Sequence, residues 1–227
     1  MEQKQSFGTR FRPLRGPVRV LHEALLLSLA ILGAVWSLEI HSDLGIVIFK
    51  EQFLALIFTI AMVALFLAAP ARPADSGSRV PWYDWILIAL SLAAGGFVVG
   101  YFHVIRDDIG LESPARWGLG TIAVLLVLEA TRRVAGWALI VLALALMFYA
   151  RFADFFPGFL NAPSENWTTL ARYMYLDNNA LFGFPLSVTV SMIIAFIMFG
   201  RMLYAVNGDK VLTDFAMAVM GRTRCHR

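Results

Sequence analysis

The stretch WGLGTIAVLLVLEATRRVAGWALIVLALALMFYA, residues 117–150, is apolar on both sides of a charged centre that holds Glu129, Arg132 and Arg133. As one α-helix it would be about 50 Å long at 1.5 Å per residue, whereas the hydrocarbon core of a bilayer is about 30 Å thick. It would also place two Arg side chains at the bilayer centre, each at a cost of about 2.5–3.5 kcal/mol. We therefore predict two helices, residues 117–130 and 134–150, with residues 129–133 as a charged turn at a membrane–water interface. The first helix is short for a span, and a re-entrant segment is the alternative.

The rest of the chain repeats this alternation of apolar blocks and charged connections. Of its 227 residues, 59% are hydrophobic and 15% are charged, against about 45–50% and about 25% in soluble domains. Each block is apolar all round, so it needs burial on every face, which lipid supplies. The pattern predicts an all-α, multi-pass transmembrane protein and excludes a soluble globular domain. The net charge of +3 has no basic run interleaved with aromatic residues, so we expect no nucleic-acid partner.

Four further apolar blocks are long enough to cross a bilayer: residues 20–38, 53–69, 82–102 and 186–206. Together with the pair in 117–150 they predict about six spans. The first block follows a basic leader, as in a secretory signal, but no small-residue cleavage site follows it. We interpret it as a retained anchor, with a cleaved signal as the alternative. Residues 70–81 are rich in Pro, Gly and Ser and predict a loop.

Lys and Arg residues set the orientation of the predicted spans. With six spans, one side holds fourteen of the 19 basic residues and the other side holds five, which places both termini in the cytoplasm. The fourteen are Lys4, Arg10, Arg12, Arg15, Arg19, Arg72, Arg79, Arg132, Arg133, Arg201, Lys210, Arg222, Arg224 and Arg227, and the five are Lys50, Arg106, Arg116, Arg151 and Arg172.

No arrangement of residues indicates catalysis, so we expect no enzymatic activity. The single cysteine is Cys225, none of the four His residues has a metal-ligand spacing, and no phosphate-binding glycine loop is present. Glu129 is spaced to pair with Arg132 or Arg133 on a helix, as topology anchors or, alternatively, as part of a proton relay. Gly96 and Gly100 form a G-x-x-x-G pattern that permits close helix packing, and the alternative is that they have no specific role.

Two stretches carry a family resemblance. The first is Leu128-Glu-Ala-Thr-Arg-Arg-Val-Ala-Gly-Trp137 with Phe155-Phe-Pro-Gly-Phe159. The second is Tyr175-Leu-Asp followed by Leu181-Phe-Gly-Phe-Pro-Leu186, Phe199-Gly200, Gly208-Asp, Leu212-Thr-Asp-Phe-Ala216 and Gly221-Arg-Thr-Arg224. Their order and spacing resemble the permeases of tripartite ATP-independent periplasmic (TRAP) transporters, in the fused type that joins a four-helix part to a twelve-helix part and pairs with a TAXI-type binding protein.

The resemblance implies secondary active uptake across the bacterial inner membrane. A periplasmic solute-binding protein would deliver an organic anion, often a carboxylate, and an ion gradient, commonly sodium, would drive its entry. No cofactor is implied. By this resemblance residues 1–19 are a basic cytoplasmic leader and residues 20–151 a small-subunit-like membrane domain. Residues 152–185 are then a periplasmic interfacial loop, and residues 186–227 the start of the large permease domain.

The sequence departs from the family where Cys225-His-Arg227 follows Gly-Arg-x-Arg, since the family has glycines and the large part there. The residues of the family's transport and sodium sites have no matching positions here. We therefore expect a truncated or frame-shifted fragment, or one piece of a split gene, that supports a remaining large permease domain. The alternatives are a stand-alone structural subunit that recruits a separate large subunit and, disfavoured by the missing catalytic motifs, a membrane-bound enzyme. The substrate, the coupling ion and the oligomeric state do not follow from the sequence.

Overall fold

The computed structural model describes residues 11–38, 49–71, 80–107, 114–158 and 161–221, and all of their regular structure is helical. The elements are α1 (Pro17–Ser37), α3 (Lys50–Ala68), α4 (Trp82–Asp107), α5 (Pro114–Val134), α6 (Trp137–Arg151), α7 (Trp167–Leu176), α8 (Phe184–Val188), α9 (Ile194–Ala205) and α10 (Gly208–Gly221). A 3₁₀ turn, η2 (Ala153–Phe155), follows α6, and a π-helical segment, η4 (Thr189–Ile193), joins α8 to α9.

Four helices in the described residues are long and apolar enough to cross a membrane: Pro17–Ser37, Lys50–Ala68, Trp82–Phe102 and Phe184–Ala205. They coincide with the four long blocks predicted from the sequence. The all-α, multi-pass prediction is therefore confirmed, whereas the count of six spans is not. The structure leaves α5 outside this set and gives α6 as a shorter apolar helix of 15 residues.

Helix α3 is the centre of the bundle. It contacts α1, α4 and α5, and 56% of the residues in its most apolar 18-residue stretch are buried inside the protein. For α1 and for residues 184–205 the corresponding share is 6%. Phe66 and Leu67 of α3 pack in a core with Val98 of α4 and Leu126 of α5. In the membrane, α3 is thus shielded by protein, while most of the surface of α1 is left to lipid or to further protein.

The break between α5 and α6 lies close to the predicted position but has a different origin. Glu129, Arg132 and Arg133 belong to the last turns of α5 rather than to a turn between helices, so the predicted charged turn is wrong in this detail. They remain helical because their side chains pair at i,i+3 and i,i+4 spacing. Helix α5 ends at Val134, and two residues further on Gly136, whose φ of 89° is a conformation that favours glycine, separates it from α6.

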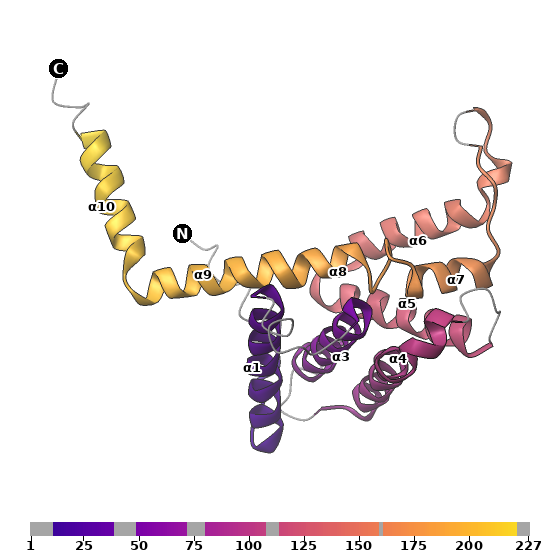
Figure 1. The fold of residues 1–227 in the computed structure, drawn as a ribbon, viewed down its shortest axis with the longest axis horizontal. Coiled ribbons are helices and arrows are strands. Elements are labelled where there is room, and N and C mark those ends of the chain that lie inside the picture. Colours follow the sequence, from indigo (N-terminus) through magenta and orange to yellow (C-terminus); the bar gives the residue numbers. More distant parts are fainter. Residues whose placement is uncertain (1–10, 39–48, 72–79, 108–113, 159–160, 222–227) are drawn as a thin grey trace.

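The segment 152–185, predicted as a loop, contains helix α7 as well as irregular structure. Leu170, Ala171 and Tyr175 of α7 are buried, and α7 packs on α5 (Figure 1). Beyond it, α8, η4 and α9 form a nearly continuous helix. Figure 1 shows α9 passing across α1 and carrying the chain away from the other helices, with α10 turning off beyond Asn207. The loop 70–81, the leader 1–19 and the motif at 221–224 lie partly outside the described residues.

Candidate functional site

A buried cluster of charged side chains closes one end of the bundle. Asp84, in the first turn of α4, accepts a hydrogen bond from Nη2 of Arg12 at 2.6 Å, and its other oxygen lies 2.8 Å from Nη1 of Arg133. The side chains of Asp84 and Arg12 are fully buried and that of Arg133 is 1% exposed. One carboxylate therefore joins the leader, the start of α4 and the end of α5.

Glu129 extends this cluster along the last turns of α5. Its Oε1 lies 2.7 Å from Nη2 of Arg132 and 2.8 Å from Nε of Arg133, and its Oε2 accepts a 2.7 Å hydrogen bond from Nε of Arg132. Both arginines also donate to carbonyl oxygens just after α3, Arg133 to Ala69 at 2.9 Å and Arg132 to Ala71 at 3.2 Å. The predicted anchors Glu129, Arg132 and Arg133 thus come together in one ion network.

Local structure places each member of this ion cluster. The backbone N–H of Arg12 donates to the Ala68 carbonyl, which holds the leader against the end of α3. Asp84 stands near the N-terminus of α4, where the helix dipole stabilises an acid, and Arg133 stands near the C-terminus of α5, where it stabilises a base. The two helix ends meet, so their dipoles and side-chain charges favour the same arrangement.

The sequence-based prediction included Glu129, Arg132 and Arg133 but missed Arg12 and Asp84 as members of a site. Asp84 carried a usable signal, because an acid at the start of an apolar span is expensive unless a base neutralises it. The identity of that base could not be read from the sequence, since Arg12 is 72 residues away. Arg12, Asp84 and Arg133 are buried and ion-paired, which suits an anchor rather than a group that meets a substrate.

Close helix packing was predicted at Gly96 and Gly100, but the close contact of α4 within the described residues is at Gly95. A Cβ built on Gly95 would collide with the hydroxyl of Thr59 in α3, so α4 approaches α3 closely at Gly95. A Cβ on Gly96 or Gly100 meets no atom of the described residues within 4 Å. Close packing at Gly96 and Gly100 therefore stays a prediction that concerns a partner outside the described part of the chain.

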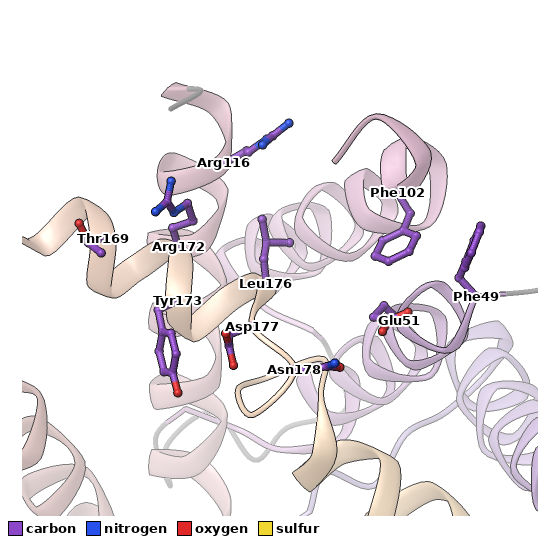
Figure 2. Close-up of a pocket in the computed structure, with 10 residues that line it drawn as sticks. All are labelled: Phe49, Glu51, Phe102, Arg116, Thr169, Arg172, Tyr173, Leu176, Asp177 and Asn178. Atoms are coloured by element: carbon purple, nitrogen blue, oxygen red, sulfur yellow. The ribbon is translucent and has the colours of Figure 1, made fainter. Parts of the chain in front are cut away.

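A pocket of about 550 Å³ that includes four charged residues lies at the opposite end of the same helices (Figure 2). Its walls come from the start of α3, the end of α4, the start of α5 and helix α7, and its charged residues are two basic and two acidic: Arg116, Arg172, Glu51 and Asp177. Figure 2 shows Arg116 and Arg172 on the same side of the pocket, with Asp177 and Asn178 below them. The pocket is electrically balanced, and the described residues in and around it include no group of three or more potential metal ligands.

Tyr175 links α7 to the middle of α4. Its side chain is fully buried, and its hydroxyl donates a hydrogen bond to the Ala94 carbonyl. Burial raises the pKa of the Tyr175 phenol, because a phenolate would lose its hydration there. Tyr175 therefore acts as a neutral hydrogen-bond donor that holds α7 against the bundle.

Residues 122–226 match the family of the tripartite ATP-independent periplasmic transporter, DctM component. Comparisons with curated proteins and with solved structures gave no match.

The match to DctM begins in the middle of α5 and extends through α10, so it includes Glu129, Arg132 and Arg133 of the ion cluster and excludes Arg12 and Asp84. It also begins inside the segment that we assign to a small-subunit-like domain. The DctM family is a family of transporter permeases and not of enzymes, in agreement with the absence of catalytic motifs in the sequence.

Proposed function

We propose that the chain is a membrane permease component of a TRAP-type secondary active transporter. The single observation that carries this proposal is the match of residues 122–226 to the DctM component. The four apolar helices of spanning length agree with a permease, and the family resemblance adds the finer features. These are residence in the bacterial inner membrane, uptake of an organic anion delivered by a periplasmic binding protein, and an inward ion gradient, commonly of sodium, as the driving force.

Within that transporter we assign the described helices a supporting role. Helices α3, α4 and α5 are fixed at one end by the buried ion cluster and in the middle by the close contact at Gly95. A bundle held in this way resists relative motion of its helices, as a support for a moving part must. The fused type with a TAXI-type binding protein, and the division into domains at residues 20–151 and 186–227, belong to the same proposal.

The arrangement of charges supports the proposed orientation, with both termini in the cytoplasm. Arg12, Arg132 and Arg133 were all assigned to the cytoplasmic side from the sequence, and they meet in one cluster. Arg116 and Arg172 were assigned to the periplasmic side, and both line the pocket at the other end. Each end of the bundle thus collects residues that the positive-inside rule places on the same side.

The test is uptake by membrane vesicles that contain this chain and any permease encoded beside its gene. The binding protein encoded beside it is added to the vesicles. We expect uptake of a labelled organic acid that requires the binding protein and an imposed ion gradient, proceeds without ATP, and is lost when this chain is deleted. Vesicles with the chain alone should show no uptake. Uptake that needs ATP, or that is unchanged without this chain, contradicts the proposal.

The alternative is a structural subunit that recruits a separate large permease subunit. It is favoured by the exposed apolar surface of the C-terminal helices, since no residue of α9 is buried and the side chains of Phe196, Phe199 and Phe215 are between 63% and 72% exposed. Affinity purification of the chain in mild detergent separates the two roles. Recovery of an independently encoded large permease favours the structural subunit, and a continuous chain that carries both parts favours the fused permease.

A further inference from the structure

An apolar groove runs along the outside of the bundle between α4 and α5. Its volume is about 680 Å³, and most of its lining comes from aliphatic side chains of these two helices: Ile86, Leu87, Leu90, Ile122, Leu125 and Leu126. Leu126 is buried at its floor, whereas Ile86 and Leu125 form rims that are 48% and 58% exposed. Along α5 the groove extends from Ile122 to Arg132, about 15 Å at 1.5 Å per residue. This length is about half the thickness of the hydrocarbon core, which is the depth of one lipid leaflet.

The groove opens on the ion cluster at one end. Arg132 lines it there with a side chain that is 24% exposed, unlike the buried Arg133. A guanidinium group has five N–H donors, and among the described residues three of those of Arg132 are used, two by Glu129 and one by the Ala71 carbonyl. Two donors remain for a group from outside the described chain. Both oxygens of Glu129 are already occupied by arginines.

Aromatic residues flank the same opening. Trp82 and Tyr83 line the groove, Trp82 with 75% of its surface exposed, and the guanidinium carbon of Arg132 lies 5.9 Å from the ring of Trp137. Such amphipathic rings favour the level of the lipid headgroups. The cluster as a whole has three arginines and two acids, so the opening has a net charge of +1.

We propose that this groove binds one anionic phospholipid, with an acyl chain between α4 and α5 and the phosphate on Arg132. The apolar lining and the length of the groove fit an acyl chain, the two remaining N–H donors fit phosphate oxygens, and the net positive charge selects an anionic headgroup over a zwitterionic one. The bound lipid would join two helices at the end that the ion cluster closes. This site is separate from the transport activity proposed above, and its test does not depend on uptake.

The test is lipid binding by the purified chain in detergent, measured by native mass spectrometry with phosphatidylglycerol or phosphatidylcholine of identical acyl chains. We expect the wild-type chain to prefer phosphatidylglycerol about fivefold, the contribution of one Arg near an anionic headgroup. Arg132→Gln should abolish this preference. Arg201→Gln, which removes an exposed Arg from α9, should retain it.

Ile86→Trp is the second variant, because it fills the groove and leaves every charge in place. It should lower the binding of both lipids, whereas Leu92→Trp, at an exposed position on the same helix outside the groove, should not. Arg132→Gln removes a partner of Glu129 and could prevent folding. The comparison of the two Trp variants still tests the groove in that case, because neither variant changes a charge. The proposal is overturned if the wild type shows no preference, if Arg132→Gln retains it, if the two Trp variants bind alike, or if glycerol 3-phosphate competes as well as the lipid.

Discussion

Replacing Asp84 with Ala tests the ion cluster at its central member. The carboxylate of Asp84 has one oxygen 2.6 Å from Arg12 and the other 2.8 Å from Arg133, and none of the three side chains is more than 1% exposed. The substitution leaves two buried guanidinium groups with one acid fewer. Removing one partner from a buried ion pair costs about 3–5 kcal/mol, a large part of the total of about 5–15 kcal/mol that stabilises a typical domain. We therefore expect Asp84→Ala to lower the free energy of unfolding by about 3–5 kcal/mol.

The assay is equilibrium unfolding of the purified chain in mixed micelles of a mild detergent and increasing SDS, followed by tryptophan fluorescence. The matched control is Glu23→Gln, which removes the acid of an exposed pair with Arg19 whose side chains are 55% and 66% exposed. This control should leave the transition unchanged, because water and salt screen such pairs.

A double variant separates the charge effect from the loss of packing. In Arg12→Met with Asp84→Ala, one of the two uncompensated charges is gone, so the loss of stability should be smaller than the sum of the two single losses. If Asp84→Ala unfolds at the same SDS fraction as Glu23→Gln, the cluster is not buried and paired in the membrane protein, and the reasoning fails.

Two further substitutions test the packing of the bundle in the same unfolding assay. Gly95→Ala should destabilise the chain by about 1–3 kcal/mol, because its Cβ collides with Thr59, whereas Gly96→Ala should have no such effect; equal effects would contradict the proposed packing. Tyr175→Phe should cost about 1 kcal/mol, because it removes the hydrogen bond to the Ala94 carbonyl while preserving the ring. A variant as stable as the wild type would show that this bond contributes nothing.

The positions of most helices along the chain could be predicted from the sequence. An apolar block of spanning length can bury all of its faces in few ways other than as a helix in lipid. The predicted blocks 20–38, 53–69, 82–102 and 186–206 differ from the observed helices of spanning length by a few residues at most. The two-helix interpretation of residues 117–150 also holds, although the break follows the charged residues instead of including them. Ion pairing between Glu129 and Arg132 favours helical backbone through the charged residues. Gly136, with a positive φ, lies just beyond the end of that helix.

Contacts between distant residues could not be predicted. The pairing of Arg12 with Asp84 depends on how the leader folds back against α3, and no local pattern specifies that. The close contact of α4 with α3 occurs at Gly95, beside the G-x-x-x-G pattern, because the face that α4 turns toward α3 is set by the packing of the whole bundle. Helix α7 was missed because its aromatic residues also suit an interfacial loop, whereas its buried face is only three residues, Leu170, Ala171 and Tyr175.

In the proposed topology, these helices cross a membrane with the ion cluster inside the cell and the end of α6 outside. This topology is tested most directly with single cysteines in a Cys225→Ser background. Ala135→Cys is at an exposed position beside the cluster, and Phe155→Cys is at a position beyond α6 where the side chain is 84% exposed. In spheroplasts we expect a membrane-impermeant maleimide to label Phe155→Cys at once, and Ala135→Cys only after permeabilisation. Labelling of Ala135→Cys in intact spheroplasts would contradict the account.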